Sequence, residues 1–450
     1  MTDGPHTQHG LLGIGFGPSH LSLAALCAST RSPAVRSRLH FLESRPSFSW
    51  HPDMLLDGTR MQIAFLKDLV TAQAPTSPYS FTNYLVTHGR LERFLSLGTL
   101  HPSRLEYADY FAWAARALSP HVTYAATAVR IRPVSGTDGS VTHLEVDHRD
   151  AAGRSRTTTA RHLSLAPGGR PLLPPGTALS PSVFHSSTFL SSVQPFHLRG
   201  HDLPHRFLVT GAGQSAAEIF RYLAREFPAA DITLAHRGFA LLPAVNSPLA
   251  NAIYEPDAVD LFHTADPARR RSLLTDLRTT NYGAVEEQDI RAIAELLYDQ
   301  RVHGTARLRL SPFTELADCH TIGTLAHVTL RDPLTGQTVH DRYDAVILAT
   351  GFDHRESGGL LDDLEPHLMR DSRSELLIRR DYSVQTTPGF RPRVFLHGAA
   401  EHTHGPTSPV LSVLAHRAAR ILDAAFGPPP DGKAPHPPAA HTDDLVGADQ

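Results

Sequence analysis

The stretch LLGIGFGPSHLSLAAL, residues 11–26, places a short apolar run, a glycine-rich turn and an apolar helical pattern in direct succession. A buried parallel strand that feeds the helix of a nucleotide-binding unit has this pattern. Gly13 allows the tight turn, and Gly15 lets the backbone approach a pyrophosphate at the helix N-terminus, where free N–H groups favour negative charge. Gly17 and Pro18 complete the turn. Pro18 replaces the usual third glycine, and a first helical turn tolerates proline.

The acid that follows the next strand indicates which nucleotide this loop binds. Residues 39–42 form the predicted strand, and Glu43 comes directly after it. A carboxylate in that place accepts hydrogen bonds from ribose hydroxyls and repels a 2′-phosphate. The first loop therefore favours FAD or NAD over NADP.

A second unit repeats the pattern in FLVTGAGQSAAE, residues 207–218, with Gly211 and Gly213 in the turn. The strand that follows, residues 232–235, is succeeded by His236 and Arg237 and not by an acid. A cation there suits the 2′-phosphate of NADPH. The acid after the first loop and the base after the second assign FAD to the first loop and NADPH to the second.

The rest of the chain predicts the connections between these units. Residues 121–165 alternate like a strand meander, and residues 265–303 have a helical pattern. DAVILATGF, residues 344–352, reads as a third strand with a glycine turn, which in two-dinucleotide flavoproteins returns the chain to the FAD domain. The last 24 residues, from Gly427, are Pro-rich and cannot bury enough surface to offset ordering entropy, so they are predicted to be disordered.

We therefore predict an α/β fold with two Rossmann-like dinucleotide-binding domains, for FAD and NADPH, and a substrate pocket between them. The predicted divisions are a first part of the FAD domain (1–190), an NADPH domain with substrate-binding insertions (191–343), the return segment of the FAD domain (344–426) and the tail (427–450).

Composition excludes several classes of function. The formal net charge of −3 gives no reason to expect nucleic acid or an anionic membrane as a partner, and no apolar run approaches the ~20 residues of a membrane span. Cys27 and Cys319 form no CxxC pair, which excludes a dithiol reductase and a zinc knuckle and favours a reducing, cytoplasmic setting. The 29 His are scattered without a metal-ligand motif, so no metal is expected. A homo-oligomer is compatible with the sequence.

Longer motifs make the sequence specific. From about Leu11 to Leu422 it resembles the flavin-dependent N-hydroxylating monooxygenases of siderophore pathways, the L-ornithine N5- and L-lysine N6-hydroxylases. Besides the two glycine loops, the resemblance rests on FSWHPDMLLDGTRMQIAFLKDLVTAQAPTSPYSFTNYL (48–85), SRLEYADYFAWAA (103–115), FHSS (184–187), SPLANAIYEP (247–256), TNYG (280–283), ATGF (349–352) and EHTHGPTSPVLSVLAHR (401–417).

The resemblance implies cofactor contacts for matching residues. It places Met61 and Gln62 against the flavin, with Gln62 close to the reaction. The same long motif brings Trp50 and His51 to the cofactor. In the second loop, Gln214 and Ser215 are implied to bind NADPH.

It also implies a substrate site. Lys67 would bind the substrate carboxylate. Asn251 and Ser412 would bind the amino-acid end of the substrate. Asn281 would face the reacting amine and the nicotinamide ribose. The residues themselves agree for Lys67, because a lysine within the apolar stretch IAFLKDLV calls for an anionic partner.

The reaction implied is hydride transfer from NADPH to FAD, reaction with O₂ to give the flavin C4a-hydroperoxide, and attack of a neutral primary amine on its distal oxygen. The amine stays open between ornithine and lysine, because HGPTSPVLS (404–412) and APTSPYSFTNYLV (74–86) look closer to the lysine enzymes, whereas TNYGAVEEQDI (280–290) looks closer to the ornithine enzymes. Alternatives are N-hydroxylation of a diamine such as putrescine or cadaverine, oxidation of sulfur or ketone substrates, and a non-catalytic flavoprotein.

Overall fold

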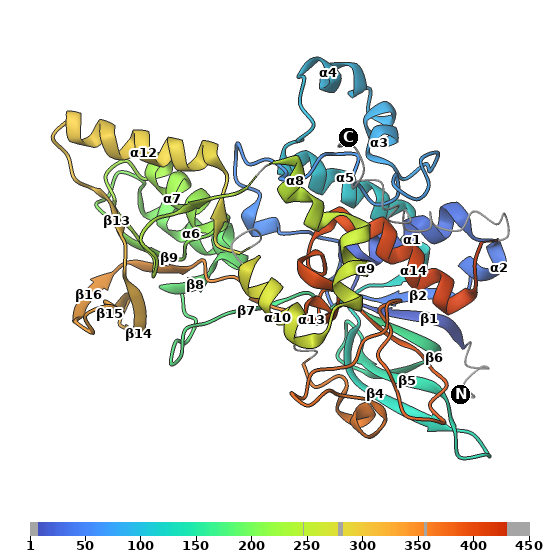
Figure 1. Cartoon of the computed structure of the whole chain (residues 1–450). Helices are drawn as coiled ribbons and strands as arrows, with labels where there is room; N and C mark the ends of the chain where they lie inside the picture. The colour runs from blue at the N-terminus through green and yellow to red at the C-terminus, as the bar shows by residue number, and fades with distance from the viewer. Residues whose placement is uncertain (1–7, 246, 278–281, 355–357, 430–450) are drawn as a thin grey trace, which may run out of the picture.

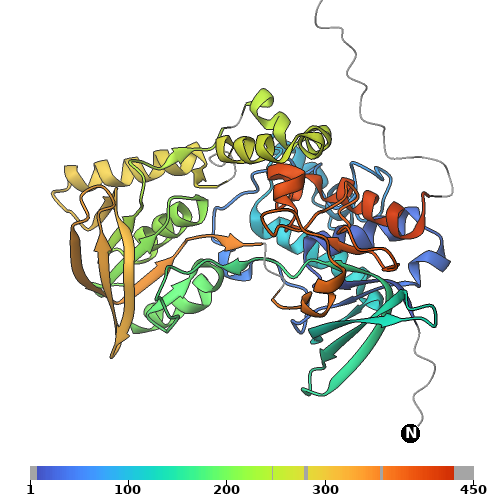
Figure 2. The same ribbon diagram turned by 60° about the horizontal axis from the view of Figure 1, so that its bottom comes forward.

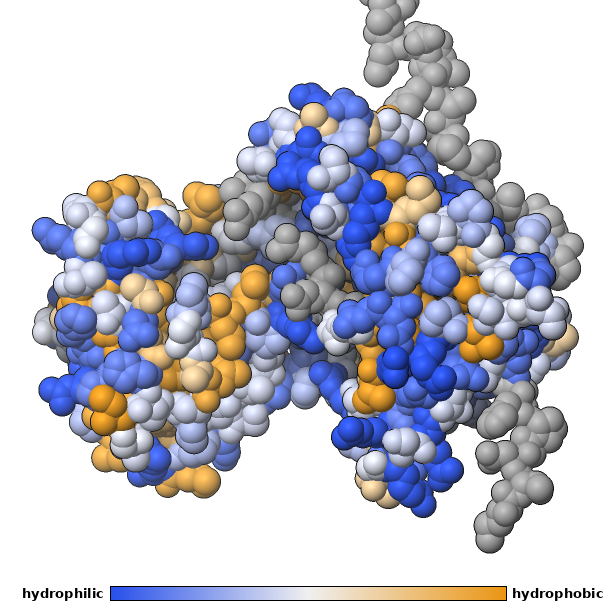
Figure 3. All heavy atoms as spheres, turned by 90° about the horizontal axis from the view of Figure 1, so that it is seen from below, coloured by the Kyte–Doolittle hydropathy of each residue, from blue (hydrophilic) through white to orange (hydrophobic). Residues whose placement is uncertain are grey.

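The structure is a computed structural model that describes residues 8–245, 247–277, 282–354 and 358–429. Predicted site residue Asn281 and residues 430–450 of the predicted tail lie outside this part. The chain forms two lobes, each built on a sheet with parallel strands at its centre (Figure 1). A space-filling view from below shows hydrophilic and hydrophobic residues intermixed on the surface of both lobes, with a hollow between the two lobes (Figure 3).

The first lobe contains the sheet β3-β2-β1-β6-β5-β4, with β19 paired to β6. Strands β1, β2, β3 and β19 run parallel to their neighbours, whereas β4, β5 and β6 form the predicted antiparallel meander. Helix α1 packs between α5 and α14. These elements are β1 (His9–Ile14), α1 (Pro18–Thr30), β2 (Leu39–Leu42), α5 (Arg104–Ala117), β3 (Val122–Thr123), β4 (Thr127–Ser135), β5 (Val141–Arg149), β6 (Ser155–Leu165), β19 (Val394–Leu396) and α14 (Leu414–Phe426).

The second lobe contains an all-parallel sheet in the order β13-β10-β9-β17-β8. Its apolar side chains divide between two buried clusters, one shared with helices α6, α7 and α12 and the other with the meander β14-β15-β16. The elements are β8 (Val183–His185), α6 (Phe189–Arg199), β9 (Arg206–Thr210), α7 (Gln214–Glu226), β10 (Asp231–Ala235), α12 (Glu287–Val302), β13 (Leu308–Ser311), β14 (Glu315–Ile322), β15 (Leu325–Arg331), β16 (Thr338–Tyr343) and β17 (Ala345–Leu348).

The sheets correct two predicted divisions of the chain. β17, predicted to return the chain to the FAD domain at residue 344, pairs with β9 and β8 in the second sheet. β8 lies before the predicted boundary at residue 190, yet it is also a strand of that sheet. The chain rejoins the first sheet only at β19. All four residues of β17 are buried, and such a run fits any central parallel strand, so its composition does not reveal which sheet it joins.

A helical insertion between β10 and β13 joins the lobes. Its short helices are α8 (Pro248–Asn251), α9 (Pro256–Thr264) and α10 (Pro267–Asp276). Helices α9 and α10 pack on α13 (Glu401–His404) and the 3₁₀ turn η6 (Gly405–Thr407) of the first lobe. Both ribbon views show this insertion beside the C-terminal segment (Figures 1 and 2). An ion pair between Asp260 and Arg380 fastens the contact. Among the described residues, no helix is long and apolar enough to cross a membrane.

Candidate active site

The first glycine loop forms a concave turn at the carboxyl end of β1. Gly15 has a φ of 86°, and a Cβ there would stand 2.4 Å from the carbonyl oxygen of Ala166. A Cβ on Gly13 would stand 2.2 Å from the ring of Phe41. In front of α1, by contrast, a Cβ on Gly17 would meet nothing within 4 Å. The turn is thus closed on its protein side and open at the helix N-terminus, which fits a pyrophosphate.

Glu43 closes this loop from the neighbouring strand. Its buried carboxylate accepts the Phe16 N–H at 2.6 Å with one oxygen and the Arg45 N–H at 2.8 Å with the other. The second oxygen also accepts the Ser44 hydroxyl at 3.3 Å, whereas the oxygen bound to Phe16 keeps a lone pair for a ribose hydroxyl. Glu43 therefore lies against the glycine loop, as the sequence predicts, and these residues fit the dinucleotide FAD.

A series of hydrogen bonds between buried, neutral side chains stabilises the first glycine loop. His20 donates from Nδ1 to the Gly15 carbonyl at 2.6 Å, so its Nε2 accepts from the Ser164 hydroxyl at 2.8 Å, and Ser164 accepts from His397 at 2.9 Å. Burial lowers the pKa of His20 to about 4, since no carboxylate compensates the buried ring. Short sequence motifs do not reveal this chain of hydrogen bonds, because His20 and Ser164 lie 144 residues apart.

The second glycine loop has the same construction. Gly211 has a φ of 145°, and a Cβ there would stand 2.2 Å from the Ala349 carbonyl oxygen. Gly213 is the N-cap of α7, and half-buried Ser215 lies in the first turn of that helix. Arg237, after β10, is exposed, and within the described ranges no carboxylate pairs with it. An exposed guanidinium directly after the strand that neighbours β9 fits the 2′-phosphate of NADPH.

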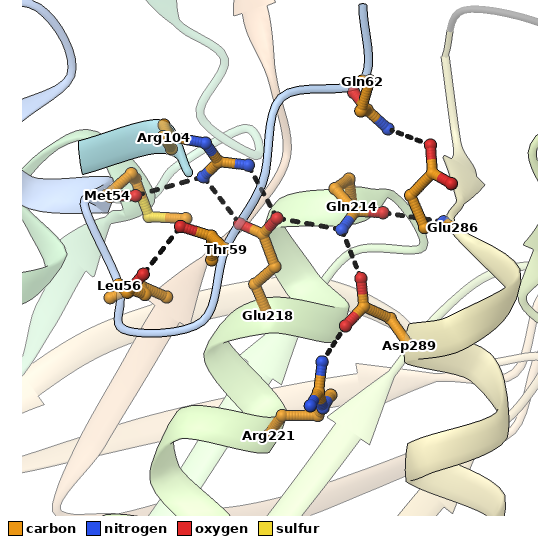
Figure 4. Close-up of polar contacts among 10 residues, drawn as sticks. All are labelled: Met54, Leu56, Thr59, Gln62, Arg104, Gln214, Glu218, Arg221, Glu286 and Asp289. Atoms are coloured by element: carbon orange, nitrogen blue, oxygen red, sulfur yellow. Dashed lines mark hydrogen bonds and ion pairs between the residues drawn. The ribbon is translucent and has the colours of Figure 1, made fainter. Parts of the chain in front are cut away.

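Gln214, which the resemblance implies to bind NADPH, has a side chain that is bound by protein. Its carboxamide oxygen accepts the Glu286 N–H at 2.8 Å, and its nitrogen donates to Glu218 at 2.9 Å and to Asp289 at 2.6 Å (Figure 4). Both N–H groups and one lone pair are thus engaged by protein. Asp289 is in turn paired with Arg221.

The predicted flavin-side residues lie on one segment of the first lobe. Met61 is buried, and exposed Gln62 donates to Glu286 of the second lobe at 3.2 Å (Figure 4). Trp50 packs edge-on against Phe111, with ring centroids 5.1 Å apart.

His51 adjoins this segment and has the left-handed backbone angle φ = 45°. Surrounding protein lowers the pKa of its ring to about 4, and the nearby charges of Arg104 and Arg45 add to the effect. The ring is consequently neutral near pH 7.

Lys67 is exposed on an irregular loop that Asp68 shapes. The buried Asp68 carboxylate accepts the N–H groups of Val70 (3.0 Å), Thr71 (2.7 Å) and Phe81 (2.7 Å), and burial nevertheless raises its pKa. Lys67 lies close enough to His416 to help lower the pKa of that imidazole, mainly lowered by burial. Among the described residues, no carboxylate forms an ion pair with the Lys67 ammonium, which leaves it available for a substrate carboxylate.

The other predicted substrate residues lie on segments that meet between the lobes. Ser412 lies in the turn before α14, and its hydroxyl is a buried oxygen without a hydrogen-bond partner among the described atoms. Half-buried Asn251 ends α8, and the next turn (Ala252–Tyr254) packs on η6, within the C-terminal segment that also carries Ser412. A buried unpaired hydroxyl is a natural contact for a polar ligand.

A cavity of about 660 Å³ lies between the lobes. It brings together Met61 and Gln62 of the first lobe with Gln214 and Glu286 of the second. Lys67, Asn251 and Ser412 do not line it, so the predicted residues form two groups and not one pocket. Within the described ranges, no group of three or more His, Cys, Asp or Glu is arranged to hold a metal ion.

Two glycine loops, each after a parallel strand of its own sheet, one closed by an acid and the other followed by a base, define a two-dinucleotide flavoenzyme that uses FAD and NADPH. Residues 7–354 match the family described as L-lysine 6-monooxygenase/L-ornithine 5-monooxygenase. A Burkholderia cepacia L-ornithine N(5)-monooxygenase is 42% identical over 89% of this chain and 90% of its own length. The chain belongs to this family of flavin-dependent N-hydroxylating monooxygenases.

Solved structures of similar proteins support the same family assignment. The ornithine N-hydroxylase of Kutzneria sp. 744, with reduced FAD, NADP⁺ and L-ornithine, has a TM-score of 0.88 and 34% identity over 93% of this chain and 99% of that one. The L-lysine 6-monooxygenase of Pseudomonas syringae has a TM-score of 0.80 and 32% identity over the same shares of the two chains. The resemblance found in the sequence is thus confirmed.

Proposed function

We propose that this enzyme N-hydroxylates the side-chain amine of L-ornithine, to supply a hydroxylamine for siderophore or related natural-product biosynthesis. The observation that carries the proposal is the exposed ammonium of Lys67, presented beside the C-terminal segment and without a carboxylate partner in the described chain. An amino-acid substrate brings the carboxylate that such a lysine calls for. The similarity to two enzymes named for ornithine supports ornithine over lysine.

When bound, FAD supplies the oxidising chemistry, taking a hydride from NADPH and activating O₂. The residues of this chain position the partners. Lys67 binds the substrate carboxylate, while Asn251 and Ser412 hold the polar amino-acid end. Arg237 binds the 2′-phosphate of NADPH at the second loop, and Gly211 and Gly213 admit its pyrophosphate.

The proton balance sets a requirement for the site. A free alkylammonium has a pKa near ~10.4, and only the neutral amine is nucleophilic. The site must therefore bind the uncharged amine or take up its proton. No residue described here is assigned as the base.

Product mass spectrometry tests the proposal. The enzyme, NADPH and O₂ are incubated with ornithine, lysine, putrescine or cadaverine, and a gain of one oxygen is measured together with NADPH consumption. We expect coupled oxygen transfer to ornithine above the other three. Preferred oxidation of lysine would move the proposal to the other amino acid, and preferred oxidation of either diamine would contradict the role given to Lys67.

A further inference from the structure

Arg104 and Glu218 form an ion pair that joins the two lobes. Arg104 begins α5 in the first lobe, and Glu218 lies on the second turn of α7 in the second lobe. The two guanidinium nitrogens reach the two carboxylate oxygens at 2.8 and 2.7 Å (Figure 4). Only 14% of the arginine side chain and 4% of the glutamate side chain are exposed. Bidentate geometry with this burial makes a directional contact that solvent screens weakly.

The same carboxylate also holds the second glycine loop. Oε1 of Glu218 accepts from Arg104 at 2.7 Å and from the Gln214 carboxamide at 2.9 Å. Gln214 is the first residue of α7, directly after Gly213. The contact between the lobes and the start of the nucleotide-binding helix therefore share one oxygen atom.

From Gln214 the contacts return to the first lobe. The Gln214 oxygen accepts the N–H of Glu286, and the Glu286 side chain accepts from Gln62 at 3.2 Å. Gln62 follows Met61 in the segment that carries the predicted flavin contacts. The hydrogen-bond network therefore begins at Arg104 and ends at Gln62, both in the first lobe. The route crosses between the lobes twice, at Arg104–Glu218 and at Gln62–Glu286 (Figure 4).

We propose that Glu218 is a positioning residue for flavin reduction: through Arg104 and Gln214 it fixes the NADPH loop relative to segment 61–62. Hydride transfer needs its two reacting atoms about 3–3.5 Å apart, and a displacement of ~1 Å costs about 100-fold in rate. One carboxylate that ties both lobes to the same loop controls that separation. Glu218 touches neither nucleotide in this scheme, because its oxygens are occupied by protein.

The test separates positioning from binding. In Glu218→Gln, rapid anaerobic mixing with NADPH should show a limiting rate of flavin reduction lower by about 10- to 100-fold. The Kd of NADP⁺ by calorimetry should change by less than about threefold, since Arg237 and the glycines are unaltered. FAD content and the rate of reduction by dithionite should not change. Hydrogen exchange of segment 56–62 should increase, because the weakened pair with Arg104 no longer holds the first lobe against the Gln214–Glu286–Gln62 contacts.

Asp341→Asn is the matched control, because Asp341 forms a bidentate pair with Arg206 (3.0 and 2.9 Å) within the second lobe. It should leave the limiting rate unchanged. The proposal is overturned if Glu218→Gln keeps the limiting rate, if it raises the Kd of NADP⁺ in proportion to the loss of rate, or if Asp341→Asn lowers the rate equally. Should Glu218→Gln yield no flavoprotein, Arg104→Lys takes its place. It keeps the charge, loses the bidentate contact and should lower the limiting rate by several-fold.

A charge exchange tests the link to Gln214. In the double variant Arg104→Glu with Glu218→Arg, the lobes are again paired, but Gln214 now faces a donor where it had an acceptor. We expect thermal stability to recover and the limiting rate to stay low. Full recovery of the rate would show that the ion pair alone suffices and would overturn the part assigned to Gln214.

Discussion

The Glu43 carboxylate accepts the backbone N–H of Phe16 at 2.6 Å, so the acid that follows β2 closes the glycine loop that follows β1. This hydrogen bond stabilises the loop itself, because Phe16 lies between Gly15 and Gly17. Glu43 thereby shapes the pyrophosphate turn and presents its remaining lone pair to a ribose.

We first predict that Glu43→Gln weakens FAD binding by about 10- to 100-fold, because a hydrogen bond to a charged group contributes about 1.5–3 kcal/mol and a tenfold change in affinity is 1.4 kcal/mol. Titration of apoprotein with FAD measures the effect. Glu92→Gln, the same change at an exposed residue of helix α4 (Leu91–Ser96), should bind FAD like the wild type. Unchanged FAD affinity in Glu43→Gln would remove the acid from the cofactor site.

The second prediction concerns coenzyme choice. Arg237→Ala should raise the KM for NADPH by about 10- to 100-fold, the loss of one charge-assisted bond to a phosphate. The KM for NADH should change little, because NADH has no 2′-phosphate. Steady-state oxidation of both coenzymes is the measurement. An equal change for both coenzymes would contradict a phosphate contact.

The third prediction is a pH dependence of stability due to His20. Unfolded His20 binds a proton below its ordinary pKa of 6.5, whereas the folded ring stays neutral until about 4. Its contribution is therefore constant above pH 6.5 and is lost as the pH falls from 6.5 toward 4.

At pH 5 the lost stability amounts to about 2 kcal/mol. Urea unfolding at pH 7.5 and pH 5 should show that His20→Gln loses about 2 kcal/mol less than the wild type over this interval. His201→Gln, at a side chain that is 61% exposed, is the control and should follow the wild type. The same loss in His20→Gln as in the wild type would contradict a neutral buried His20.

Local chemistry explains what the sequence predicted correctly. The strands at residues 39–42 and 232–235, the helices after both glycine loops and the meander at 121–165 all follow from short patterns. Gly15 and Gly211 are needed by their own backbone angles, so they too are visible locally.

The features that the sequence did not predict depend on contacts between residues far apart in the chain. Arg104 and Glu218 are 114 residues apart, and neither stands in a pattern that names its partner. The Gln214 carboxamide likewise binds Glu218, Asp289 and the N–H of Glu286, three partners that its glycine-loop motif does not name. The sheet membership of β17 depends on which apolar faces meet, and a run of four buried residues does not encode that.

The last prediction separates amino acids from diamines and depends on Lys67. Lys67→Ala should weaken ornithine binding by about 10- to 200-fold, because a charge-assisted hydrogen bond to the substrate carboxylate contributes about 1.5–3 kcal/mol. Flavin reduction by NADPH should continue, since the second loop is unaltered, and the variant should release hydrogen peroxide in place of hydroxylamine. Binding of putrescine, which has no carboxylate, should be equally weak in both proteins and is the internal control. Lys67→Arg, which keeps the cation, should recover part of the affinity. A wild type that binds putrescine as tightly as ornithine would contradict the carboxylate contact. The segment HGPTSPVLS, residues 404–412, which looks closer to the lysine enzymes, would then be the place to seek the cause.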